Sequence, residues 1–156
     1  MSGYPPVWIE WLFSHPPFFA FFFVTQGALG FYILARMSGW NRLSKRFRYR
    51  GTFYGETWPF RSARMGPLIR FGCALTMGAD ESGVYMAVFP LFRICHPPLL
   101  VPWSEVSIIS GERGLIVKKR LLFLGRQEAV SLNISSSLAE NLKEAAGKAW
   151  PVESFA

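Results

Sequence analysis

Residues 16–36 read PPFFAFFFVTQGALGFYILAR, and this stretch contains no charged side chain before Arg36. About 21 helical residues, each rising about 1.5 Å, extend roughly 30 Å, which is the thickness of the hydrocarbon core of a bilayer. The sequence therefore predicts a transmembrane helix over residues 16–37. Because the preceding residues lack the basic start of a secretory signal peptide, we expect an uncleaved anchor.

The start of this helix is marked by two prolines. Pro16 and Pro17 suit the first turn of a helix, where their missing N–H groups would have no intrahelical partner anyway. Ser14 or His15 is placed to cap the helix.

The charge distribution predicts the orientation of the helix. Residues 1–35 contain Glu10 and no Lys or Arg, whereas residues 36–70 contain nine basic residues and one acidic residue, Glu56. The positive-inside rule then places residues 1–15 outside and the rest of the chain on the cytoplasmic side of the cytoplasmic (inner) membrane. Because the positive charge is concentrated beside the apolar segment, it favours an anionic membrane surface and argues against nucleic acid as a partner.

A polar residue lies at the middle of the apolar segment. Gln26 is followed by Gly27 and Gly30, and polar or small residues at this depth are typical of a contact with another helix. The alternative is a single glutamine that is tolerated in lipid, and the sequence leaves both interpretations open.

Residues 38–50 have the pattern of a short amphipathic helix. Trp40, Leu43 and Phe47 recur at helical spacing, with basic residues on the remaining sides. We expect an interfacial helix whose membrane-surface residues are Trp40, Arg42, Lys45, Arg46, Arg48 and Arg50. The alternative is a topology signal and a solvated charge run with no further role.

The hydrophobic period changes to two in residues 51–150. Alternation over residues 69–77 predicts a strand with Ile69, Phe71, Cys73, Leu75 and Met77 on one face. Further strands are predicted at residues 84–89, at an edge position near 99–103, in a hairpin over residues 104–125 with its turn at 111–114, and at 128–134 with Val130, Leu132 and Ile134 on one face.

The chain then returns to a helical pattern before a short tail. Ser137 and Glu140 are spaced as a capping box, and Leu138 and Leu142 begin an apolar stripe. Residues 151–156 are predicted to be a C-terminal tail. The sequence thus predicts a mainly β domain, one partly open antiparallel barrel with an amphipathic C-terminal helix, behind one transmembrane helix.

Three segments resemble a known fold: SGVYMAV (82–88), LLVPWSEV (99–106) and ISSSLAENLKEA (134–145). They are similar to strands and the closing helix of pleckstrin-homology-like (PH-like) domains, including GRAM and bacterial PH domains. The whole chain also looks like a group of small bacterial membrane proteins. The resemblance implies binding of lipids or proteins. The turn GADESG (78–83), however, is acidic where phosphoinositide-binding members carry a basic loop.

Signatures of an enzyme are missing from the sequence, and we expect neither catalysis nor a cofactor. The alternative is a metal- or thiol-dependent site that uses Cys73, Cys95 and His96.

These patterns favour a non-catalytic, membrane-anchored interaction module, an accessory or assembly subunit of a larger membrane protein complex. The expected partners are a membrane protein and anionic lipid headgroups. A second interpretation is a membrane sensor that binds anionic lipids.

Overall fold

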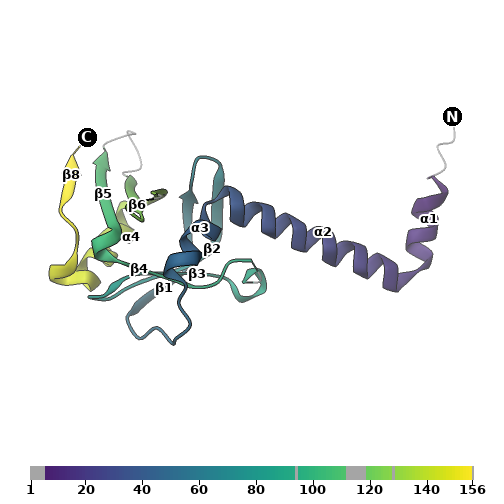
Figure 1. Ribbon diagram of the computed structural model, residues 1–156, viewed down its shortest axis with the longest axis horizontal. Coiled ribbons are helices and arrows are strands. Elements are labelled where there is room, and N and C mark those ends of the chain that lie inside the picture. The colour runs from purple at the N-terminus through teal and green to yellow at the C-terminus, as the bar shows by residue number, and fades with distance from the viewer. Residues whose placement is uncertain (1–5, 94, 112–118, 128, 156) are drawn as a thin grey trace.

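The computed structural model describes residues 6–93, 95–111, 119–127 and 129–155. The helices are α1 (Val7–Ser14), α2 (Pro16–Met37), α3 (Trp40–Phe47), η1 (Pro90–Phe92), η2 (Trp103–Glu105), α4 (Ser136–Ala146) and η3 (Gly147–Ala149). The strands are β1 (Glu56–Met65), β2 (Ile69–Ala79), β3 (Gly83–Val88), β4 (Leu99–Pro102), β5 (Val106–Gly111), β6 (Lys119–Leu124), β7 (Val130–Ser135) and β8 (Glu153–Phe155). Figure 1 shows α2 projecting from the β domain, with α1 at its far end.

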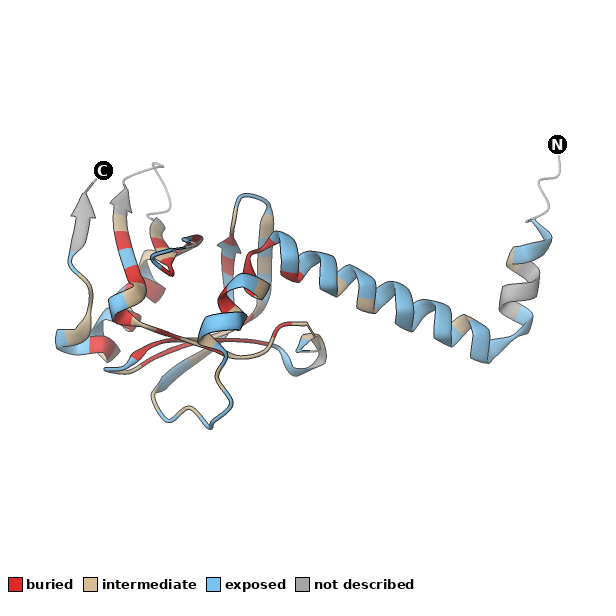
Figure 2. Ribbon diagram, viewed as in Figure 1, coloured by how far each residue is buried: buried red, intermediate tan, exposed pale blue. Residues whose placement is uncertain are grey.

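Helix α2 has 22 residues and begins at Pro16, as the sequence predicts. In the described part of the chain it is the one helix that is long and apolar enough to cross a membrane. Figure 2 shows that almost all of its length is exposed outside the β domain. His15 occupies the N-cap position, but its side chain makes no capping hydrogen bond and contacts the Ser14 hydroxyl at 3.0 Å. The sequence pattern does not predict α1.

All eight strands belong to one sheet with the order β4-β3-β2-β1-β7-β6-β5-β8. Strands β1 to β7 pair antiparallel and form a nearly closed barrel, whereas β8 pairs parallel to β5. The Pro-flanked β4 lies at the sheet edge, as expected for a segment with few free donors. The predicted mainly β domain with a C-terminal helix is confirmed. The predicted turn at 111–114 lies largely outside the described residues.

The hydrophobic core lies between the inner face of the barrel and α4. Val130, Leu132 and Ile134 of β7 are buried, which confirms the predicted alternation, and Leu138 and Leu142 of α4 belong to the same core. Burial of each such side chain contributes roughly 1.5–3 kcal/mol to folding.

The first hairpin departs from the predicted alternation. Leu75 and Met77 are buried, but Cys73 is exposed and has a φ of 49°. On the neighbouring strand Phe60 has a φ of 55°, and the pairing of β1 with β2 shifts register twice between Trp58 and Ala63. These bulges break the period-two pattern, which is why β1 is not visible in the sequence and why the inward position predicted for Cys73 is wrong.

Two predictions at the C-terminal end are also corrected. Helix α4 begins at Ser136, and its N-cap is Ser135, whose hydroxyl accepts a hydrogen bond from the Leu138 N–H at 3.3 Å. The predicted capping box of Ser137 and Glu140 is therefore wrong, because both residues lie inside the helix. Residues 153–155 form β8 and pair with β5, so the segment predicted as a tail belongs to the sheet.

Helix α3 forms over the residues that the sequence indicates, but its apolar face packs against the β domain and not against a membrane surface. Trp40 is 0% exposed and Leu43 is 2% exposed, and both belong to the core of the β domain. The expectation that Trp40 faces the membrane surface is wrong, because the barrel supplies the apolar surroundings that an interface would otherwise supply.

Candidate functional site

The C-terminal end of α2 is built into the β domain. Ala35 and Ser38 are 2% and 1% exposed, and the ring of Phe31 lies 5.1 Å from the ring of Phe92 in η1. Gly66, in the β1–β2 turn, has a φ of 64°, and a Cβ at this position would lie 3.4 Å from the Ser38 carbonyl oxygen. Helix α2 therefore continues into a packed junction and not into a flexible linker.

Trp40 connects α3 to the segment that precedes β4. Its indole Nε1 donates a hydrogen bond to the Pro97 carbonyl oxygen at 2.9 Å. Its ring lies 5.7 Å from Phe71 and 5.4 Å from His96 between centroids. Because the polar tip of the indole has a partner, the complete burial of this residue is favourable.

His96 is buried in the same aromatic cluster. It is 2% exposed, and neither ring nitrogen has a hydrogen-bond partner among the described residues. Desolvation by burial lowers the pKa of His96 below its ordinary value, and the nearby Phe92 backbone opposes this shift without forming a well-aligned hydrogen bond to the ring. The imidazole is therefore neutral in the folded protein at pH 7.

The polar face of α3 carries exposed cations. These are Arg42, Lys45 and Arg46, and the exposed Arg48 and Arg50 follow the helix. Arg46 lies 3.7 Å from the Glu105 carboxylate, and within the described ranges this is the only ion pair formed by the five cations. The contact of these five residues with a membrane surface stays a prediction.

One cavity, which we call the junction cavity, lies where α2, α3 and the connection between β3 and β4 meet. Its volume is about 310 Å³. It is lined by Tyr32, Ala35, Asn41, Ser44, Arg48, Arg93, Cys95 and Pro97. Two guanidinium groups and several neutral polar groups thus line this space, and none of the described residues that line it is a carboxylate.

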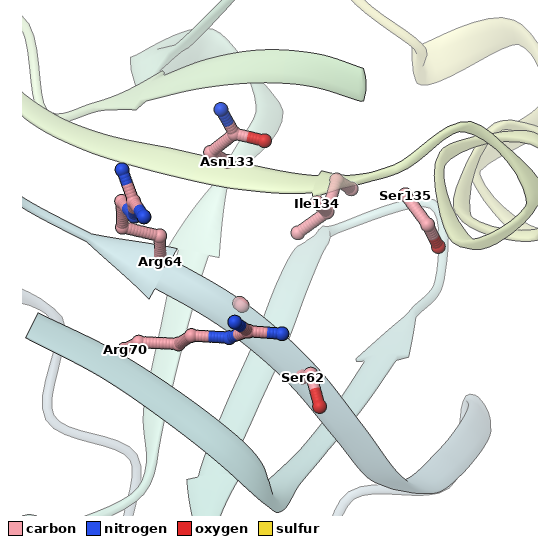
Figure 3. A pocket seen from close by; sticks show the side chains of 7 residues that line it. Ser62, Arg64, Arg70, Asn133, Ile134 and Ser135 are labelled. Atoms are coloured by element: carbon pink, nitrogen blue, oxygen red, sulfur yellow. The ribbon is translucent and has the colours of Figure 1, made fainter. Parts of the chain in front are cut away.

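A second cavity, the strand cavity, lies on the outer face of the sheet beside the short β1–β7 pairing. Its volume is about 210 Å³, and it is lined by Ser62, Ala63, Arg64, Arg70, Asn133, Ile134 and Ser135. Arg64 pairs directly with Arg70 on β2 and with Asn133 on β7. Figure 3 shows Arg70 extending over β1 towards Ser62. Two like charges opposite each other are unfavourable unless solvent or an anion compensates them.

The polar midpoint of α2 is open to its surroundings. Gln26, Gly27 and Gly30 are exposed, and a Cβ at either glycine would meet no atom within 4 Å. With 3.6 residues per turn, Gln26 and Gly30 lie on the side of α2 opposite Ala35, which packs on the domain. The predicted helix–helix contact stays a prediction.

The structure separates the residues of the alternative thiol or metal site. Cys73 is exposed on β2, Cys95 is half-buried, and His96 is enclosed by Trp40 and Phe71. Over residues 6–93, 95–111, 119–127 and 129–155, the structure brings together no three His, Cys, Asp or Glu side chains that could hold a metal ion. A three-ligand metal cluster of these residues is therefore not formed in the described part of the chain, while the thiol-dependent alternative stays a prediction.

Sequence reasoning did not identify the two cavities. Arg64 and Arg70 were visible as part of the basic stretch of residues 36–70, but their pairing depends on the register of β1 with β2. Arg93 lies 45 residues after Arg48 in the chain, and no sequence signal relates them.

No model of a known protein family matches this chain, and the search of curated proteins finds no match either.

Proposed function

We propose that this chain is a non-catalytic, membrane-anchored PH-like interaction module, an accessory or assembly subunit of a larger membrane protein complex. We place it in the cytoplasmic (inner) membrane of a bacterium, with its N-terminus outside and the β domain in the cytoplasm. The observation that carries this proposal is the packed junction. Ala35, Ser38 and Trp40 are buried, so the C-terminal end of α2 is packed against the β domain.

The PH-like assignment is supported by the order and closure of the strands. Seven antiparallel strands form a nearly closed barrel, and α4 follows directly after β7 and packs on the core. This arrangement is compatible with the bent barrel and closing C-terminal helix that the sequence resemblance implies.

If the junction is rigid, a partner that binds α2 also determines the position of the β domain. The side of α2 that carries Ala35 is occupied by the domain, while the opposite side, with Gln26 and Gly30, is exposed. A partner helix that forms hydrogen bonds with the Gln26 amide in the bilayer would fix the rotation of α2 about its axis. The β domain would then present a defined face to the same complex.

The test is the size of the assembly that mild detergent extracts from the native membrane. We expect Gln26→Leu to release the chain as a smaller species, because the interhelical hydrogen bonds of the amide are lost. Thr25→Val is the matched control, since the Thr25 hydroxyl donates within its own helix to the carbonyl oxygens of Phe21 and Phe22, each at 2.9 Å. An unchanged assembly in the Gln26→Leu variant would contradict the helix contact.

A second candidate function is binding of anionic lipids. It is favoured by the exposed cations of α3, of which only Arg46 pairs with a carboxylate among the described residues. Each basic residue near an anionic leaflet contributes about 1 kcal/mol to binding. We expect the purified full chain to retain anionic lipid in preference to zwitterionic lipid, and the retention to fall steeply as salt increases.

A further inference from the structure

We propose that the junction cavity binds the phosphate group of a membrane phospholipid. This inference rests on the proposed membrane anchorage of α2 and names a specific site for the lipid contact. The cavity shares Arg48 with the exposed cations, but it also requires Arg93 and Tyr32, so it is formed by three separate parts of the chain. Its volume of about 310 Å³ is that of a small-ligand site.

The side chain of Arg93 and the backbone of Arg48 are each held by contacts with the β domain. The Arg93 Nε donates to the Val88 carbonyl oxygen at 3.2 Å, which fixes the guanidinium next to the end of β3. Arg48 forms a β-bridge with Leu99, and the next N–H in the chain, that of Tyr49, donates to Pro98 at 2.8 Å. The Arg93 guanidinium and the Arg48 backbone are therefore positioned before any ligand arrives, which lowers the entropic cost of binding.

The charge of the cavity is not balanced within the described part of the protein. No carboxylate lines it, and neither Arg48 nor Arg93 forms an ion pair with a described residue. Guanidinium groups match the oxygens of a phosphate in geometry and charge. Tyr32, Asn41 and Ser44 add neutral polar groups of the kind that contact the remaining oxygens of a headgroup.

The position of the cavity along α2 favours a lipid as the source of the phosphate. Tyr32 and Ala35 belong to the last two turns of α2, where a spanning helix leaves the hydrocarbon core. The adjacent Phe31–Phe92 ring pair lies on the same side of the helix, and Phe89 next to η1 is 47% exposed. A phospholipid with its phosphate in the cavity would place its acyl chains against these rings.

The experiment compares two double variants of the full chain that each remove two positive charges. Arg48→Gln with Arg93→Gln changes the cavity, whereas Arg61→Gln with Lys148→Gln changes exposed cations that lie outside both the cavity and α3. Native mass spectrometry of the chain released from micelles with added phosphatidylglycerol measures the lipid retained. We expect retention to fall roughly tenfold or more in the cavity variant, because two charge-assisted contacts are lost, and to change less than threefold in the control.

Equal losses in the two double variants would overturn the site and indicate a general effect of surface charge. Binding of inorganic phosphate with the same affinity as phosphatidylglycerol would show that a free anion, and not a lipid, is the ligand. Loss of the native chain from the membrane during carbonate extraction would contradict the anchorage itself, so failure of the anchor and failure of the site are distinguishable.

A measurement on the native chain removes any dependence on the folding of the variants. Cys95 lines the cavity and Cys73 is exposed elsewhere on the domain. In nanodiscs, we expect phosphatidylglycerol to slow the alkylation of Cys95 relative to Cys73, compared with phosphatidylcholine at equal ionic strength. An unchanged ratio of the two rates would refute occupation of the cavity by an anionic headgroup.

Discussion

Replacement of Trp40 by alanine tests whether α3 belongs to the β domain or to the membrane surface. The indole is 0% exposed and lies against Phe71 and His96. Truncation of a buried tryptophan costs about 3–5 kcal/mol in transfer and cavity free energy. The Pro97 carbonyl oxygen also loses its donor, which costs about 1–3 kcal/mol if no water replaces it.

These costs are large compared with the total free energy of unfolding, which is about 5–15 kcal/mol for a domain. With a urea dependence of about 2 kcal/mol per M, a loss of about 4 kcal/mol lowers the midpoint of unfolding by roughly 2 M. Trp40→Phe separates the two contributions, because it keeps an aromatic ring and loses the hydrogen bond. We expect it to lower the stability by less than the alanine variant.

The assay is urea unfolding of the full chain in a mild detergent, followed by far-UV circular dichroism because the replacement removes a fluorescent residue. Tyr54→Ala is the control, since Tyr54 is 92% exposed and its truncation is expected to change the stability by about 0.5 kcal/mol at most. A loss of less than about 1 kcal/mol in Trp40→Ala, together with weaker membrane binding, would refute the packed junction and restore an interfacial α3.

Two further changes test local features of the domain. Burial lowers the pKa of His96 below 6.5, so its contribution to stability is complete above this pH and is lost as the pH falls towards the folded value. We expect the urea midpoint of the native chain to decrease between pH 7.5 and 5.5, and His96→Phe to remove most of that decrease; an equal decrease in both proteins would show that other groups titrate. Ser135→Ala should lower the stability by about 1 kcal/mol through loss of the α4 cap, while Ser137→Ala should leave the midpoint nearly unchanged. A larger loss of stability in Ser137→Ala than in Ser135→Ala would support the capping box that the sequence pattern predicts.

The long apolar helix and most of the strands were predictable because their signals are local. The absence of charge before Arg36 and the two prolines at its start define α2 without reference to any other element. Strand β7 was predictable for the same reason, since each alternate side chain in Val130–Ile134 faces one core.

The partners of several segments could not be predicted, because they depend on residues far away in the chain. Strand β8 exists only through its parallel pairing with β5. The alternation of β1 is interrupted by bulges that are recognisable only in register with β2. The junction cavity likewise combines Arg48 with Arg93, which are brought together by the pairing of residue 48 with β4 and the turn after β3.

The stretch from α2 into α3 shows which features the sequence determines and which features depend on the tertiary structure. Its amphipathic pattern determines that a helix forms and that Trp40 and Leu43 are more stable in apolar surroundings than in water. A bilayer interface and a protein core satisfy that requirement equally well, because both withdraw apolar surface from water. Only the folded barrel, which offers a partner to the Trp40 indole N–H at Pro97, decides in favour of the core and makes the predicted tether a rigid connection.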